Sequence, residues 1–214
     1  KRQIYLLFHG LSPYSGISKK ILHQVKGFEA CGHRVSLCTY SIADNGHRVR
    51  MINNEIIEDY GTGKPAAAKR RVSYQCIYRY AVTHQVELIY VRSFHNANPF
   101  TIRLFSKLRK AGIKIAMEIP TYPYDSEYAG FPLVTRLGIQ VDKVFRKTLA
   151  KHVNAIVTFS DYHCIFGQRT IQISNGVDFD SIPLKKTVSK NTSVIHLLGA
   201  VSYTHLTLPT TPYV

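Results

Sequence analysis

The sequence lacks the long apolar run that a membrane-spanning helix needs. Its longest apolar stretches, Ile4 to Phe8 and Ile195 to Leu198, fall far short of the roughly 20 residues required. The first two residues are basic, but the apolar run after them is too short for a secretory signal peptide. We therefore expect a globular protein of the cytoplasm. With 214 residues and 45% apolar composition, it can bury a sizeable core.

Cysteine is scarce, and no two cysteines form a C-x-x-C pair. The four are Cys31, Cys38, Cys76 and Cys164. Their spacing argues against both a zinc knuckle and a thioredoxin-type redox centre. We expect four buried thiols and no metal site.

Several catalytic motifs are also missing. The sequence has no G-x-S-x-G, H-E-x-x-H or G-x-G-x-x-G, which disfavours hydrolase, metalloprotease and hydride-transfer chemistry. The segment G-T-G-K at 61–64 is not a phosphate loop, because that motif needs glycine in place of Glu58 and serine or threonine in place of Pro65. No cofactor is expected.

Acidic side chains are few. The 13 acidic residues face 28 basic ones, which gives a formal net charge of +15. Such a balance indicates nucleic acid, an anionic membrane or phosphorylated substrates as surroundings. A basic nucleic-acid-binding α/β protein is therefore one alternative, with tyrosines and phenylalanines available for stacking. The sequence has no RNA-recognition signature and no helix-turn-helix pattern, so we do not expect nucleic acid as a partner.

What the sequence does contain is a regular alternation of short β-branched segments with longer segments of helical period. It predicts an α/β fold, with a Rossmann-like parallel sheet and helices on both faces. Asn98 is the expected cap of the third helix, while Gly32 and Gly112 are expected to end the first and third helices. The expected strands are 3–9, 34–40, 48–52, 86–92, 114–119, 154–159 and 171–173, and the expected helices are 16–30, 66–85, 99–111 and 132–151.

Ligands bind at the carboxyl edge of such a sheet, which draws attention to the turn after the first strand. There, Ser15, Gly16 and Ile17 open a helix. Glycine lets the backbone approach a ligand, and first-turn N–H groups attract phosphate or carboxylate. The structural alternative is that Ser15 only caps the helix and Gly16 only relieves a tight turn.

The same rule selects polar residues after the later strands. The segment 118–125 combines a carboxylate with prolines and tyrosines, a rigid aromatic wall suited to a sugar ring. The alternative is a packed loop in which backbone N–H groups or an arginine satisfy Glu118. The further candidates for substrate binding are Arg92, Ser93, His95, Glu118, Thr121, Tyr122, Ser160, Asp161, Asn175 and Gly176.

Three motifs together resemble the N-terminal domain of retaining family-four glycosyltransferases of the GT-B fold. They are S-P-Y-S-G-I-S-K-K at 12–20, G-H-x-V at 32–35 and S-N-G-V-D at 174–178. The resemblance implies metal-free transfer of a sugar from a nucleotide sugar to a saccharide or lipid-linked acceptor, in cell-surface or capsular polysaccharide synthesis. By the same resemblance, the Gly16 N–H faces the diphosphate and Glu118 lies near the acceptor, as the acceptor-side catalytic candidate.

The resemblance also predicts the domain organisation. Residues 1–190 would form the acceptor-binding domain, and 191–200 the first strand of a nucleotide-sugar-binding domain. That family's paired-glutamate motif has no counterpart here, so we expect this fragment to be inactive alone. Residues 201–206 resemble the translation of a sequencing-library adapter, so we expect 201–214 to be a non-native tail rather than a natural extension.

The segment 132–151 reads as a basic amphipathic helix. It predicts peripheral contact with an anionic membrane, at the inner face of the cell membrane. The alternative is that its apolar stripe packs on the sheet while its lysines face water. A second overall alternative is a Rossmann-like domain that binds a small molecule without catalysis. The apolar residues of the segment are Leu133, Leu137, Val141, Val144, Phe145 and Leu149.

Overall fold

The computed structural model describes residues 1–12, 14–92, 96–125, 130–174 and 176. Residues Lys1–Gly176 belong to one compact unit. The strand expected within 191–200, the tail at 201–214 and Asn175 lie outside the described residues, as do Ser93 and His95.

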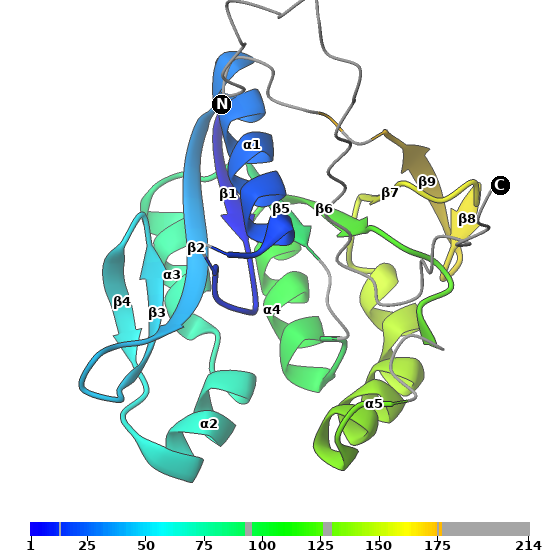
Figure 1. The fold of residues 1–214 in the computed structure, drawn as a ribbon. Helices are drawn as coiled ribbons and strands as arrows, with labels where there is room; N and C mark the ends of the chain where they lie inside the picture. Colours follow the sequence, from blue (N-terminus) through cyan, green and yellow to red (C-terminus); the bar gives the residue numbers. More distant parts are fainter. Residues whose placement is uncertain (13, 93–95, 126–129, 175, 177–214) are drawn as a thin grey trace, which may run out of the picture. The chain divides into compact units, whose positions relative to one another are not determined.

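The described strands form one sheet in the order β4-β3-β2-β1-β5-β6-β7-β9-β8 (Figure 1). The strands from β2 to β9 in this order pair in parallel, which confirms the predicted Rossmann-like α/β sheet. Both ends of the sheet are antiparallel, however, because β3, β4 and β8 belong to hairpins. The bounds are Arg2–Leu6 (β1), Arg34–Ile42 (β2), Arg48–Ile52 (β3), Glu55–Asp59 (β4), Leu88–Arg92 (β5), Lys114–Ile119 (β6), Ala155–Thr158 (β7), Cys164–Ile165 (β8) and Gln168–Gln172 (β9).

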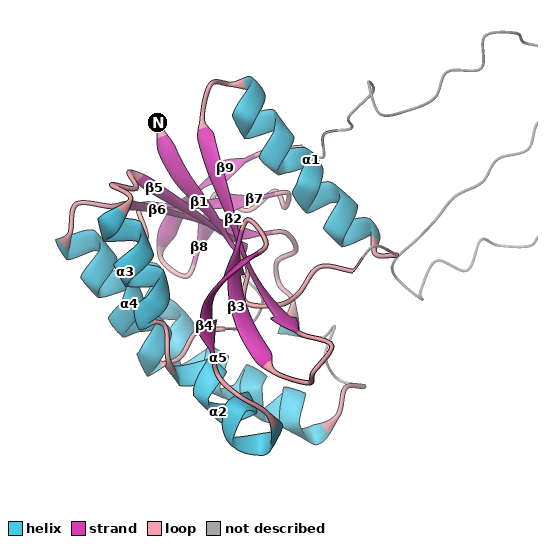
Figure 2. Cartoon of the chain, turned by 90° about the vertical axis from the view of Figure 1, so that its left-hand side faces the viewer, coloured by secondary structure: helices cyan, strands magenta, loops and turns pink. Residues whose placement is uncertain are grey.

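Helices cover both faces of the sheet, as predicted, and they do so unequally. Figure 2 shows α1 on one face and the other four helices on the opposite face. Side chains alternate along β1, so that Ile4 and Leu6 enter the larger core while Tyr5 and Leu7 enter the smaller core beneath α1. The helices are Gly16–Ala30 (α1), Gly63–Val72 (α2), Gln75–Thr83 (α3), Pro99–Lys110 (α4) and Leu133–Ala150 (α5).

The predicted helix signals are confirmed at the ends of α1 and α4. Gly32 and Gly112 have φ values of 80° and 81°, the left-handed conformation that suits glycine after a helix. The Asn98 side chain accepts hydrogen bonds from the backbone N–H groups of Phe100 and Thr101. Thr101 Oγ1 in turn accepts from the Asn98 N–H at 3.0 Å, which completes a capping box.

The single helix expected at 66–85 is wrong, because the chain breaks between α2 and α3. Ser73 is extended, with φ −102° and ψ 109°. Its carbonyl oxygen accepts a hydrogen bond from the Tyr60 hydroxyl at 3.2 Å. The break places Tyr74 in the core, edge-on to Phe8. Burial of the Tyr74 ring therefore overrides a sequence that is compatible with a continuous helix.

The expectation of four buried thiols is wrong for two of them. Cys38 and Cys76 are buried, but Cys31 and Cys164 are exposed. Cys31 is the residue that ends α1, and Cys164 lies in β8 at the edge of the sheet. One exposed thiol thus lies at the end of a helix and the other on an edge strand of the sheet.

Most of the apolar stripe of α5 faces outward. The buried Asp142 determines this, since its carboxylate accepts hydrogen bonds from the Ala97 N–H (2.9 Å) and the Tyr124 hydroxyl (2.7 Å). Of the six apolar residues in the stripe, Leu149 is buried and Phe145 half-buried. The other four are Leu133, Leu137, Val141 and Val144, exposed by 69%, 58%, 44% and 71%.

Candidate functional site

The first turn of α1 has no side-chain cap. Ser15 makes no capping hydrogen bond with its side chain. A Cβ atom built on Gly16 would meet nothing within 4 Å, and the φ of Gly16 is not left-handed. Neither structural role considered for these two residues is therefore observed. The first-turn N–H groups, which an α-helix leaves without intrahelical partners, lie beside open space at Gly16.

Arg92 and Glu118 form a buried ion pair across neighbouring strands. They are register partners on β5 and β6, and the Arg92 guanidinium donates to Glu118 Oε1. Glu118 Oε2 accepts from the Tyr90 hydroxyl at 2.7 Å and from Gln24 Nε2 at 2.9 Å. The arginine partner considered for Glu118 is thus present. These additional hydrogen bonds are what a carboxylate with no exposed surface requires.

The hydrogen-bond network continues into α1 and β1. Gln24 Oε1 accepts a hydrogen bond from the Tyr5 hydroxyl at 2.5 Å. Burial first, and then the nearby Glu118 carboxylate, raise the pKa of Tyr5 and of Tyr90. Both phenols therefore stay protonated and act as donors. The network ties α1, the helix that covers this face among the described residues, to the middle of the sheet.

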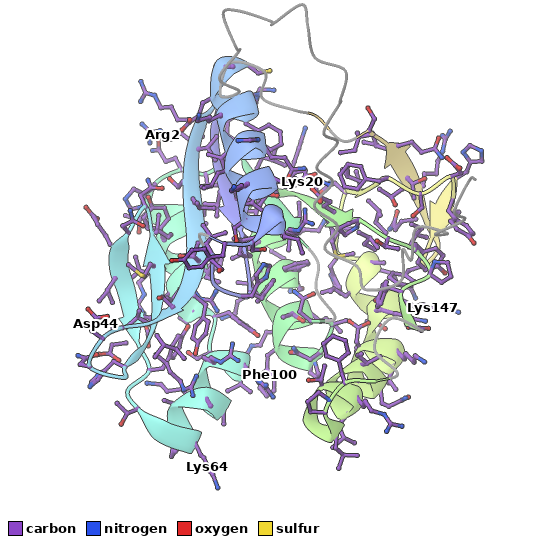
Figure 3. The ribbon with its side chains drawn as sticks, viewed as in Figure 1. Arg2, Lys20, Asp44, Lys64, Phe100 and Lys147 are labelled. Carbon is purple, nitrogen blue, oxygen red and sulfur yellow. The ribbon has the colours of Figure 1, made fainter. Side chains whose placement is uncertain are left out.

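Lys20 brings a second cation to this edge. It lies one turn after Gly16, and its Nζ is 3.6 Å from the centroid of the Phe159 ring, just after β7. Figure 3 shows Lys20 on the side of α1 that faces the later strands. Burial first, and then the Arg92 charge, lower the pKa of Lys20. The same two causes lower the pKa of His9, which follows β1. Lys20 thus brings positive charge to this edge, where Glu118 offsets the charge of Arg92. An anion bound there would favour the charged form of Lys20.

Three further predicted residues lie together after β6 and β7. The Tyr122 backbone N–H donates to Ser160 Oγ at 3.0 Å, while Thr121 is exposed. The Tyr122 ring is edge-on to the rings of Tyr162 and Phe166, with centroids 5.0 and 5.5 Å apart. The aromatic character expected of this loop is therefore present as a packed cluster. Tyr162, 47% exposed, is its outermost ring.

One remaining candidate, Gly176, lies outside the hydrogen-bond network described above. Gly176 is exposed, and a Cβ atom built on it would meet nothing within 4 Å. The sequence did not single out Tyr5, Gln24, Tyr90 or His9. One signal was available, because Gly16, Lys20 and Gln24 follow at intervals of four and so share one helical face.

One surface hollow lies on another part of the sheet. It has a volume of about 430 Å³, and Arg2 in β1, Arg34 in β2 and Glu87, just before β5, line it. This is the amino edge, opposite the edge where parallel α/β sheets bind ligands. In the part of the chain that the structure describes, no group of three or more His, Cys, Asp or Glu side chains is placed to hold a metal ion. No helix of the described residues is long and apolar enough to cross a membrane.

Comparison with protein-family models, with curated proteins and with solved structures finds no match to this chain. Its class therefore rests on the fold and the site together. It is an α/β protein with a Rossmann-like sheet, whose carboxyl edge carries an uncapped helix N-terminus beside Lys20 and Arg92. Such an arrangement is suited to binding an anionic ligand.

Proposed function

We propose that this chain is the acceptor-binding domain of a retaining glycosyltransferase. The enzyme would move a sugar from a nucleotide sugar to a saccharide or lipid-linked acceptor, in cell-surface or capsular polysaccharide synthesis. The motifs at 12–20, 32–35 and 174–178 support the family. The observation that carries the proposal is the uncapped first turn of α1 at the carboxyl edge, with Lys20 one turn further along the helix.

The chemistry of this edge fits a diphosphate leaving group. As the sugar departs, negative charge grows on the diphosphate, and fixed N–H dipoles and cations stabilise that charge without a metal ion. In this proposal the Gly16 N–H contacts the diphosphate and Lys20 supplies a positive charge. Glu118 acts as a positioning residue, since its oxygens hold Arg92, Tyr90 and Gln24.

The Gly16→Ala variant tests the contact with the diphosphate. The new methyl group fits the open space, so the fold is retained, and α1 gains about 0.5–1 kcal/mol in helix stability. The methyl group also keeps a ligand away from the backbone N–H. We expect the dissociation constant for uridine diphosphate, measured by NMR titration, to rise about tenfold, as the loss of one hydrogen bond to a charged group implies.

The matched control is Gly27→Ala, on the same helix and also beside open space. It should stabilise α1 equally and leave the affinity unchanged. In the wild-type protein, the amide signals of residues 15–20 should shift during the titration. Equal affinity in the two variants, or no shift at residues 15–20, would contradict the proposed site.

We also propose that α5 lies on an anionic membrane surface. Its exposed stripe of Leu133, Leu137, Val141 and Val144 has basic residues beside it, and its single acidic residue, Asp142, is buried. Arg136, Lys143 and Lys147 are exposed, and Figure 3 shows Lys147 on this helix. An apolar stripe bordered by cations matches the interface of a bilayer that carries anionic lipid.

Flotation with phosphatidylserine vesicles tests the membrane contact. Changing Leu137 and Val144 to Gln removes apolar surface without disturbing the core, because both side chains are largely exposed. We expect the bound fraction to fall about tenfold or more. Val82→Gln, at a half-exposed valine of α3, is the control and should bind like the wild type. Absence of wild-type binding at low salt would rule out this contact.

A further inference from the structure

Three arginine side chains gather around Tyr40, near the carboxyl end of β2. Arg48 Nη1 donates to the Tyr40 hydroxyl at 2.6 Å. The Cζ atoms of Arg50 and Arg70 lie 6.0 and 4.2 Å from the centroid of the Tyr40 ring. Arg48 and Arg50 stand two residues apart on β3, and Arg70 comes from α2. The strand β3 and the helix α2 thus both place arginine side chains around the Tyr40 side chain.

In the part of the chain that the structure describes, these cations have no carboxylate partner. Among the described residues, side-chain ion pairs are made by His47, Arg92, Lys143 and Arg146, and by none of the three arginines. Glu58, the half-buried register partner of Arg50, forms no ion pair with it. Burying an uncompensated charge is costly, so a compensating group is expected nearby.

Arg50 is the most deeply buried of the three arginines, with only 1% of its surface exposed. Its Nη1 donates to the Leu7 carbonyl oxygen at 2.8 Å. The nearby Cys38 thiol supplies no negative charge, since burial raises the pKa of that thiol to about 12. Burial likewise raises the pKa of the Tyr60 phenol, which stays neutral. Against the effect of burial, Cys38 and Tyr60 raise the pKa of Arg50, so they favour its charge. Among the described residues, however, no carboxylate forms an ion pair with Arg50.

The cluster also contains hydrogen-bond donors that have no acceptor among the described residues. The Nε atoms of Arg48, Arg50 and Arg70 are all buried and have no hydrogen-bond partner. Burial first, and then the charges of Arg71, Arg48 and Arg50, lower the pKa of Arg70 despite the opposing effect of Tyr40. Buried polar groups are normally satisfied, so three unsatisfied donors in one cluster indicate a missing acceptor.

The cluster lies at the edge of the sheet where ligands bind, and solvent reaches it. The Tyr40 N–H donates to the His9 carbonyl oxygen at 3.4 Å, which places Tyr40 beside the end of β1. Arg48 and Arg70 are half-buried rather than enclosed. Figure 1 shows α2 beside the end of the sheet where β2 and β3 meet in their hairpin.

We propose that Arg48, Arg50 and Arg70 bind a phosphate group of a small-molecule ligand. A phosphate carries enough negative charge to offset several cations, and its tetrahedral oxygens accept hydrogen bonds from more than one guanidinium fork. A ligand seated here would contact α2 and β3, whereas the diphosphate proposed above contacts α1. The arginine site does not depend on the transferase function, and each can be tested without the other.

Chemical footprinting locates the site directly. Phenylglyoxal modifies accessible arginines, and mass spectrometry follows the modification of each one. We expect inorganic phosphate to slow the modification of Arg48 and Arg70 about tenfold, while the exposed Arg79 of α3 reacts at an unchanged rate. Unchanged rates at Arg48 and Arg70, or equal protection of Arg79, would overturn the proposal.

The Arg70→Gln variant gives an independent measurement, because Arg70 is half-buried and is better tolerated than a change at Arg50. Calorimetric titration at constant ionic strength should show phosphate affinity reduced about tenfold, with Arg79→Gln as the unchanged control. A pyrophosphate titration separates the two ligand types, since tighter binding of pyrophosphate indicates a diphosphate and tighter binding of phosphate a monoester. If Lys20→Gln weakens phosphate binding and Arg70→Gln does not, the anion sits at α1 and the proposal fails.

Discussion

Glu118 and Arg92 are a charge pair that has been removed from water, and their energetics are decided by what happens when one partner is lost. Glu118→Gln keeps the size of the side chain and an oxygen that can accept from Tyr90, but it leaves the Arg92 charge buried without a counter-charge. Such losses cost about 3–5 kcal/mol. We expect the free energy of unfolding, measured by urea denaturation, to fall by about 3 kcal/mol.

The control for this prediction is Glu29→Gln, at an exposed position near the end of α1, which should change the stability by less than about 0.5 kcal/mol. A second substitution tests the cause. Adding Arg92→Met to Glu118→Gln removes the uncompensated charge, so it should restore part of the lost stability. If Glu118→Gln unfolds at the same urea concentration as Glu29→Gln, the pair contributes little and the account is wrong.

For single residues, the sequence predicts which polar side chains lie at the carboxyl edge of the sheet, but not which of them form hydrogen bonds with one another. Arg92, Glu118 and Ser160 were singled out because they lie at the carboxyl ends of parallel strands or just after them. Tyr5 and Gln24 were missed because a tyrosine within a strand and a glutamine on a helix carry no motif. Their roles depend on which face of β1 and of α1 each side chain occupies, and that is decided by packing.

Among the elements, the ones with clear end signals were predictable. The bounds of α1 were correct because Gly32 stops the helix, and those of β3 and β6 were correct as well. The strand β4 was missed, although Asn53 and Asn54 are a signal for a two-residue hairpin. Their φ values of 49° and 69° are the left-handed pair that such a turn requires, and asparagine tolerates this conformation.

The orientation of α5 shows why an apolar stripe alone does not decide which face of a helix is buried. The periodicity of the sequence selects the side with Leu137, Val141 and Val144, yet those residues are exposed. The polar contacts of Asp142 with Ala97 and Tyr124 fix the opposite rotation. A hydrophobicity pattern does not identify a buried aspartate that accepts two hydrogen bonds, because the pattern assigns every aspartate to the surface.

At the scale of the whole molecule, the described residues form two cores of unequal size. The core beneath α1 consists of Tyr5, Leu7, Ile21, Tyr90 and Val157 with their half-buried neighbours, and α1 is the described helix that covers it. The opposite core is much larger, and α3, α4 and α5 all contribute buried residues to it. Less buried apolar area means a smaller free energy of local opening. We therefore expect α1 to separate from the sheet before α3, α4 and α5.

Native-state hydrogen exchange measures this order. The amides of α1 should exchange through an opening whose free energy lies below that of global unfolding, whereas the amides of β5 and β6 should exchange only through global unfolding. Glu118→Gln disturbs the acceptor of the Gln24 amide, so it should lower the free energy of the α1 opening further. Uridine diphosphate should slow exchange in α1 above all, since the proposed contact is at its first turn. If α1 and β5 instead share one opening free energy and one denaturant dependence, the two cores unfold as a single unit. The positively charged edge would then be a rigid site, one that a ligand fills without ordering α1.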